Sequence, residues 1–177
     1  MDRVIRAPCL QCSEEIEYLY KTIEIPYFSD ALITTVICPS CGFRSVDVMI
    51  LGENEPARYT LAVSAPKDME ARVVRSTTST IELPELGILA EPGPICEGFI
   101  TNVEGVLVRM IDVVNRVISW SEGEELERAE ALKVRIEDMR SGNVPFTLVI
   151  QDQDGNSAII HPNAVKSAFV PYEDRMT

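Results

Sequence analysis

The chain has 177 residues, of which 46% are hydrophobic, and its 28 acidic against 16 basic residues give a formal net charge of −12. This length fits one ordinary domain, or a small module followed by a medium one, with enough apolar residues for a buried core. The charge argues against a general nucleic-acid-binding protein, because phosphate contacts need Lys and Arg, and it favours a basic protein partner.

The sequence predicts a soluble protein, cytoplasmic or nuclear, without a signal peptide or a membrane span. Its start, "MDRVIRAPCLQC", contains no long apolar segment. The most apolar stretch, "GVLVRMIDVVNRVISW", is interrupted by charged residues such as Arg109 and Asp112, so it is not expected to cross a bilayer.

Two CxxC pairs give the clearest chemical signal. Cys9 and Cys12 form the first pair, and Cys38 and Cys41 form the second. In a reducing compartment such pairs are more typical of metal binding than of disulfides. Four thiolates complete the tetrahedral shell of Zn²⁺ and leave no position for water, so the spacing predicts one structural zinc ion. Gly42 follows the second pair, where a positive φ is useful. A redox motif and an iron–sulfur site are the alternatives, but two pairs around a β-rich segment do not fit a thioredoxin-like site.

The predicted fold is α+β and mostly β, with a four-cysteine zinc ribbon over residues 1–52 and a β-sandwich or barrel-like domain over residues 53–177. In the ribbon, "EIEYLYKTIEI", "DALITTVI" and "FRSVDVMIL" are rich in strand-forming residues. The polar loop "GENEPAR" marks the boundary. Beyond it, "RYTLAVSA" alternates, "ARVVRSTTSTIELPEL" is β-branched throughout, and "GILAEPGPICEGF" is predicted to be a loop.

A helical hairpin is predicted at about residues 102–141, because apolar residues recur there at helical spacing on both sides of a short link. Thr101 with Glu104 three residues later has the capping-box pattern, and Ser121 with Glu124 repeats it at the start of the second helix. The sequence therefore predicts Thr101 and Ser121 as the two N-caps.

Strands return after the hairpin, where "FTLVI" and "SAIIH" flank "QDQDGN". Asp154-Gly155 is a turn signal. Asp152, Asp154 and Asn156 look superficially like a calcium loop, but the glycine is at the wrong position and no Glu follows at the bidentate position.

Cys96 and His161 are the remaining candidates for catalysis. A free cysteine is most often a buried small apolar residue, and this is the favoured interpretation of Cys96. A Cys96–His161 dyad stays open, although nothing in the sequence brings the two residues together.

Four motifs follow one another over about residues 9–160: "IPYFSDALITTVICPSCGFRSVDV", "RVVRSTTSTIELPEL", "VEGVL" and "FTLVIQDQDGNS". In their combination and order the chain resembles the ZPR-type zinc-finger proteins. Eukaryotic members resemble two tandem copies of this module, whereas this chain has one, like the archaeal form. Two positions depart from the family pattern: Asn102 replaces the second residue of a Thr-Thr pair, and Arg75 stands where Lys is frequent.

The resemblance implies a protein-interaction module that binds translation elongation factor 1-alpha and assists its folding, with no enzymatic activity. The alternatives are a nucleic-acid-associated zinc ribbon, which the charge opposes, and an enzyme built on the β-rich domain. A cupin-like metal enzyme would need several His or carboxylate ligands in a cavity, and His161 is the single histidine, so the sequence disfavours the second alternative. Candidate partner contacts are Tyr27, Phe28, Arg72, Arg75, Glu104, Asp152, Asp154 and Asn156.

Caps and turns already explain several of these residue types, so each candidate contact has a structural alternative. Tyr27 and Phe28 beside Pro26 either form an exposed surface or pack against the second domain. Arg72 and Arg75 are three residues apart in a predicted strand and are therefore expected on opposite faces.

Overall fold

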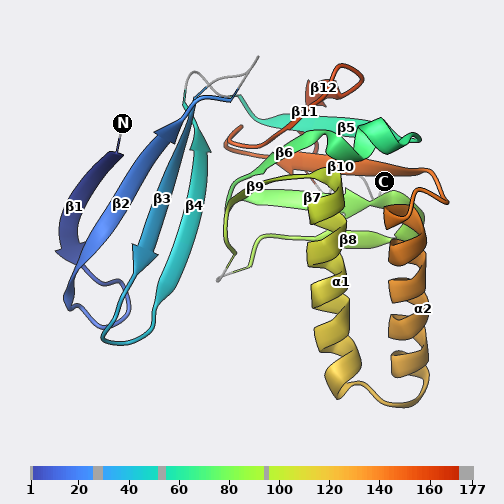
Figure 1. The fold of residues 1–177 in the computed structure, drawn as a ribbon, viewed down its shortest axis with the longest axis horizontal. Helices are drawn as coiled ribbons and strands as arrows, with labels where there is room; N and C mark the ends of the chain where they lie inside the picture. Colours follow the sequence, from blue (N-terminus) through green and yellow to red (C-terminus); the bar gives the residue numbers. More distant parts are fainter. Residues whose placement is uncertain (1, 26–29, 52–54, 94–95, 172–177) are drawn as a thin grey trace.

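The computed structural model describes residues 2–25, 30–51, 55–93 and 96–171. It contains three antiparallel sheets and one helical hairpin (Figure 1). The predicted mostly-β α+β architecture is confirmed, with the qualification that the sheets do not close into a barrel.

The first sheet is a four-stranded meander in the order of the chain. Its strands are β1 (Asp2–Pro8), β2 (Glu15–Ile23), β3 (Ala31–Ile37) and β4 (Arg44–Ile50). The sequence pattern predicted β2, β3 and β4 but not β1, which pairs along its whole length with β2, from Asp2 opposite Lys21 to Pro8 opposite Glu15. Both turns that carry cysteines lie at the same end of this sheet, which is called the zinc end here (Figure 1).

The second part of the chain forms two further sheets. The five-stranded sheet has the order β12-β5-β10-β7-β8 and the three-stranded sheet the order β11-β6-β9. Their strands are β5 (Ala57–Val63), β6 (Arg72–Arg75), β7 (Ser79–Leu83), β8 (Ile88–Ala90), β9 (Phe99–Asn102), β10 (Phe146–Asp152), β11 (Ala158–Ile160) and β12 (Val165–Ala168), with short 3₁₀ turns η1 (Pro66–Glu70) and η2 (Pro84–Leu86).

The β-branched run "RVVRSTTSTIEL" does not form one strand. It divides into β6 and β7, which belong to different sheets. The predicted loop "GILAEPGPICEGF" carries β8 near its start and leads into β9. Both differences follow from tertiary pairing, which decides strand positions more strongly than local propensity does.

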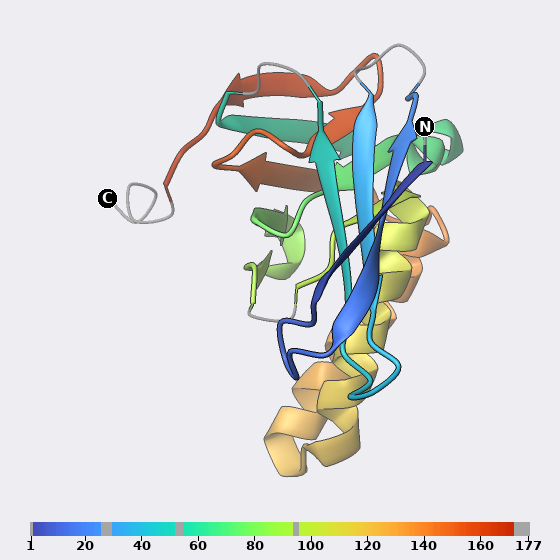
Figure 2. The same ribbon diagram turned by 90° about the vertical axis from the view of Figure 1, so that its left-hand side faces the viewer.

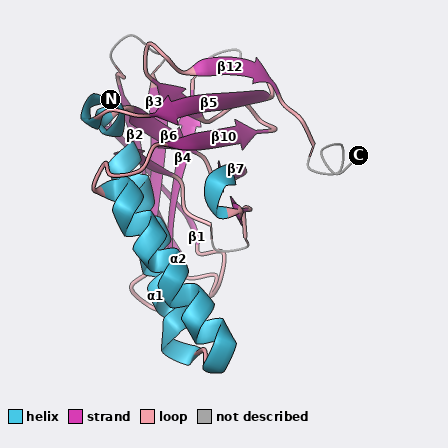
Figure 3. Ribbon diagram, turned by 90° about the vertical axis from the view of Figure 1, so that its right-hand side faces the viewer, coloured by secondary structure: helices cyan, strands magenta, loops and turns pink. Residues whose placement is uncertain are grey.

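The helical hairpin is confirmed as α1 (Val103–Trp120) and α2 (Gly123–Arg140), which lie side by side and project away from the sheets (Figure 3). The first turns of α1 pack into a core that they share with the five-stranded and the three-stranded sheet. Among the fully buried members of this core are Leu61, Val73, Leu83, Val106, Leu107, Ile136 and Leu148.

Both predicted helix caps are wrong by one residue or more. Thr101 belongs to β9, and Asn102 caps α1, with its Oδ1 accepting a hydrogen bond from the N–H of Gly105 at 2.8 Å. A β-carbon at position 105 would overlap Oγ1 of Thr101, so a larger residue there would force the Thr101 side chain to move. Ser121 ends α1 instead of starting α2, since its N–H donates to the carbonyl of Val117.

The four-stranded sheet packs against the second part of the chain through an apolar cluster. Ala31, Val48 and Ile50 meet Val74 and Ala158 there, and all five are at most 3% exposed. Figure 2 shows the four-stranded sheet in front of the helices, with the sheets of the second part above.

Gly98 allows a close backbone approach between the two parts. Its N–H donates to the carbonyl of Val46 at 2.8 Å. A β-carbon at position 98 would lie 2.6 Å from the backbone nitrogen of Val48 and 3.1 Å from the carbonyl oxygen of Arg75. Only glycine therefore allows the two backbones to come this close.

Candidate metal centre

Two reverse turns bring the four predicted cysteines together. Cys9 and Cys12 lie in the turn between β1 and β2, and Cys38 and Cys41 lie in the turn between β3 and β4. Their Sγ atoms all lie within 4.8 Å of one another, with 3.8 Å between Cys9 and Cys41 and 3.6 Å between Cys12 and Cys38. Four sulfurs at about 2.3 Å from a tetrahedral Zn²⁺ are about 3.8 Å apart. The cluster therefore fits one zinc ion.

The two turns have the same backbone structure. In each, the N–H of the first cysteine donates to the carbonyl five residues later, at 2.7 Å for Cys9 and 2.8 Å for Cys38. The fifth residue of each turn has a left-handed backbone: φ is +63° at Ser13 and +76° at Gly42. Gly42 was predicted, and Ser13 was missed, although it stands at the same distance after its CxxC pair.

Burial and ionisation of the thiols are uneven. Cys9 and Cys38 are buried and pack with Ile16, whereas Cys12 and Cys41 are exposed. The backbone N–H of Cys41 lowers the pKa of Cys38 to about 7 against the effect of burial. For Cys12, a backbone hydrogen bond at Glu14 lowers the pKa, but the Cys41 thiol and burial outweigh it and raise the pKa to about 12. A divalent cation stabilises the thiolate form of all four cysteines, so with zinc bound these differences in pKa no longer decide which thiols are ionised.

Arg72 and Arg75 lie at the two ends of β6. Arg72 is exposed, whereas Arg75 is half-buried and donates to the carbonyl of Ser79 at 3.3 Å. The guanidinium of Arg75 lies 5.5 Å from the ring centre of Phe99, and that of Arg109 lies 4.3 Å from the same ring. Arg75 and Arg109 thus contact the same aromatic ring, that of Phe99, an arrangement that the sequence pattern did not indicate.

Glu104 is exposed in the first turn of α1. Its carboxylate lies 3.9 Å from the guanidinium of Arg140 at the end of α2. A carboxylate near a helix N-terminus and a cation near a C-terminus both suit the helix dipole. The residue therefore has a structural role in addition to any contact with a partner.

Asp152 lies at the centre of a buried hydrogen-bond network and is 1% exposed. Its Oδ2 accepts from the hydroxyls of Ser76 at 2.6 Å and Ser157 at 2.7 Å, and its Oδ1 accepts from the hydroxyl of Thr78 at 2.8 Å and the N–H of Asp154 at 2.9 Å. Asp152 therefore ties the turn between β6 and β7 to the turn after β10.

The neighbours of Asp152 in the sequence are more accessible: Asp154 is exposed, and Asn156 is half-buried. The predicted turn at Asp154-Gly155 is present, with a φ of +70° at Gly155. Tyr27 and Phe28 lie outside the described residues.

The single histidine is paired with an aspartate that the sequence did not single out. The Nε2 of His161 lies 3.7 Å from the Oδ1 of Asp68, which is 3% exposed. The other oxygen of Asp68 accepts from the backbone N–H groups of Ser64 and Ala65, and the first of these is the main cause of its lowered pKa. The favoured prediction of a buried Cys96 is wrong: the residue is partly exposed, and its N–H donates to the carbonyl of Gly93.

These features define a class: small, mostly-β proteins in which a four-cysteine zinc ribbon precedes a second β-rich unit that carries a helical hairpin. Residues 3–56 match the ZPR1 zinc-finger domain, and residues 67–173 match the ZPR1 jelly-roll domain. The chain belongs to the ZPR1 family. With the zinc-finger match and the four-sulfur cluster, it has a single structural zinc site.

Relatives occur in archaea and eukaryotes. The chain is 42% identical over 163 residues to a ZPR1-like protein of Methanocaldococcus jannaschii, covering 90% of this chain and 82% of that protein. It is 44% identical over 149 residues to a ZPR1-like protein of Pyrococcus horikoshii, covering 82% and 66%. A protein of Schizosaccharomyces pombe named zinc finger chaperone zpr1 is 30% identical over 153 residues, which cover 82% of this chain but 33% of that protein.

No helix in the described part of the chain is long and apolar enough to span a membrane.

Proposed function

We propose that this protein is a non-enzymatic, zinc-dependent folding factor that binds translation elongation factor 1-alpha. The main support is membership of the ZPR1 family, in which the S. pombe relative bears the name zinc finger chaperone. The formal net charge of −12 supports a basic client, because complementary charge speeds encounter.

The arrangement of exposed apolar side chains is consistent with this proposal. A folding factor needs accessible apolar surface that an incompletely folded client can contact. Leu10 at the zinc end is 81% exposed, and Trp120 at the end of α1 is 69% exposed. The zinc end and the tip of the hairpin lie on the same side of the molecule (Figure 1). We propose that both contribute to the client-binding side.

Individual contacts are also proposed. Arg72, Glu104 and Asp154 are exposed and are candidates for contact with the client, and Arg75 and Asn156 are partly accessible candidates. For Asp152 we favour a role inside the fold, because its carboxylate is buried and accepts four hydrogen bonds.

The test is a titration of the zinc-loaded protein with elongation factor 1-alpha from the same organism, both native and during refolding from denaturant. We expect a complex, a higher refolding yield, and an association rate that falls as salt is added. A Cys38→Ser variant without zinc is the control and is expected to lose binding. No complex in either state at micromolar concentrations refutes the proposal.

A further inference from the structure

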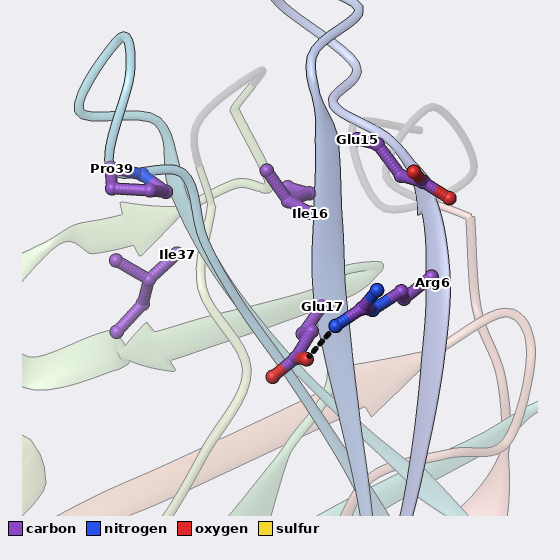
Figure 4. A pocket seen from close by; sticks show the side chains of 6 residues that line it. All are labelled: Arg6, Glu15, Ile16, Glu17, Ile37 and Pro39. Carbon is purple, nitrogen blue, oxygen red and sulfur yellow. Dashed lines mark hydrogen bonds and ion pairs between the residues drawn. The ribbon is translucent and has the colours of Figure 1, made fainter.

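A groove at the zinc end of the four-stranded sheet is a candidate binding surface with a defined chemistry. It has a volume of about 560 Å³. Its lining residues come from β1, from β2, from the end of β3 and from the second cysteine turn: Arg6, Glu15, Ile16, Glu17, Ile37 and Pro39. Figure 4 shows Arg6 and Glu17 pointing toward one another, with Ile37 and Pro39 on the opposite side.

The sheet register explains why these side chains meet. Arg6 lies directly opposite Glu17, and the register that pairs Tyr18 with Val36 brings Ile37 beside Glu17 on the same face. Ile37 is 59% exposed, which is high for a β-branched residue in a strand. The groove thus offers an apolar wall next to the carboxylate of Glu17, and the carboxylate of Glu15 lines the groove on the side away from Ile37 (Figure 4).

The charge at this end of the sheet is strongly negative. Four thiolates around Zn²⁺ carry a formal charge of −2, because four negative ligands surround one divalent ion. Glu14, Glu15 and Glu17 add three carboxylates within the same turn and strand, and Arg6 offsets one of them. Arg44 lies opposite Ile37 on β4 and adds a second positive charge, but its guanidinium is 3.9 Å from the carboxylate of Glu97, so the sum at this end stays negative. The Arg6–Glu17 pair is highly exposed, at 3.3 Å, so an incoming cation can exchange with Arg6 at little cost.

We propose that this groove binds a Lys or Arg side chain of an extended basic segment of a protein client. The aliphatic stem of such a side chain packs on Ile37 and Pro39 while its charged head reaches Glu15 and Glu17. This inference rests on the proposed function, because it assumes that the protein binds a protein client. It adds that the bound segment of the client is extended and basic.

Zinc binding and the groove are connected through Ile16. This side chain is 5% exposed, lines the groove and packs with Cys9 and Cys38 in one small cluster. Loss of zinc therefore removes the negative charge of the zinc–thiolate centre and the packing around Ile16, while the carboxylates of Glu15 and Glu17 keep their charge.

The experiment titrates the zinc-loaded protein into a short fluorescein-labelled peptide of alternating arginine and threonine at low salt, and fluorescence anisotropy reports binding. The groove variant is Glu15→Gln/Glu17→Gln. The matched control is Glu127→Gln/Glu130→Gln, which removes the same charge from exposed positions of α2. We expect the groove variant to bind about tenfold more weakly, since two partly exposed charge contacts are lost, and the control to bind within about twofold of the wild type. Zinc content and melting temperature confirm that both variants are folded.

A third variant, Ile37→Ser, tests the apolar wall and is expected to weaken binding without changing the net charge. The proposal is overturned if the wild type does not bind the peptide, if a glutamate-containing version of the peptide binds as tightly, or if groove and control variants weaken binding equally.

The same variants separate this inference from the proposed function. If elongation factor 1-alpha binds the wild type and the groove variant equally, the proposed function stands and the groove assignment fails. If the basic peptide binds through the groove but the elongation factor does not bind at all, the groove assignment stands and the proposed function fails.

Discussion

Replacing Asp152 by Asn tests whether this residue holds the fold or contacts a partner. The change keeps the shape of the side chain but replaces one acceptor oxygen by an NH₂ group. Each carboxylate oxygen of Asp152 accepts two hydrogen bonds, so two of the four donors lose their acceptor. Ser76 and Ser157 are each 2% exposed, and water does not replace a lost acceptor there.

The expected cost follows from these bonds. A hydrogen bond to a charged group contributes about 1.5–3 kcal/mol, and such contributions are not additive, so we expect Asp152→Asn to lower the free energy of unfolding by about 3 kcal/mol. For a chain of this size that loss corresponds to a melting temperature about 6–12 °C lower. The assay is thermal unfolding followed by circular dichroism, with zinc held in excess.

The control is Asp154→Ser in the same turn, which removes an exposed carboxylate and is expected to change stability by less than about 0.5 kcal/mol. If the two variants have the same melting temperature, the assignment of a structural role to Asp152 is incorrect. If Asp152→Asn keeps its stability and loses affinity for the elongation factor, Asp152 is a partner contact instead.

Three further predictions concern the ribbon and its contact with the second part of the chain. Cys38→Ser is expected to abolish zinc binding and unfold the zinc end of the four-stranded sheet, while the end that packs against Val74 and Ala158, the remaining sheets and the hairpin stay folded, which zinc analysis and amide NMR signals will report. Gly42→Ala forces a β-carbon into a φ of +76° and is expected to cost about 1 kcal/mol in a melting experiment, whereas Gly93→Ala, in open space without a positive φ, costs little. Gly98→Ala places a β-carbon against the nitrogen of Val48 and is expected to cost about 1–3 kcal/mol and to speed proteolysis between the two parts, unlike the Gly93 control.

The zinc centre could be predicted from the sequence because its geometry is local. A CxxC spacing is itself a turn, and Gly42 supplies the positive φ that this turn needs. The helical hairpin was equally predictable, since its apolar spacing repeats over many residues. The mostly-β character followed from the β-branched composition of the remaining segments.

Strand boundaries and caps depended on contacts between distant residues. The turn that separates β6 from β7 is held by Asp152, which lies 76 positions beyond Ser76. No residue pattern within "RVVRSTTSTIEL" predicts that this segment divides into two strands. Likewise, β9 pairs with β6 through Thr101 and as far as Asn102, so α1 starts only at Val103 and the last residue of the strand, Asn102, is its cap.

The arrangement of the ribbon suggests how zinc can control client binding without controlling the whole fold. The apolar cluster around Val48 and Ile50 anchors one end of the four-stranded sheet to the second part of the chain. At the other end, the buried cluster consists of Cys9, Ile16, Val36 and Cys38. Two of these four residues, Cys9 and Cys38, are metal ligands. This end therefore depends on zinc for its packing, whereas the anchored end does not. The proposed groove lies at the zinc-dependent end, so a loss of zinc is expected to remove client binding at concentrations of chelator that leave the second part folded.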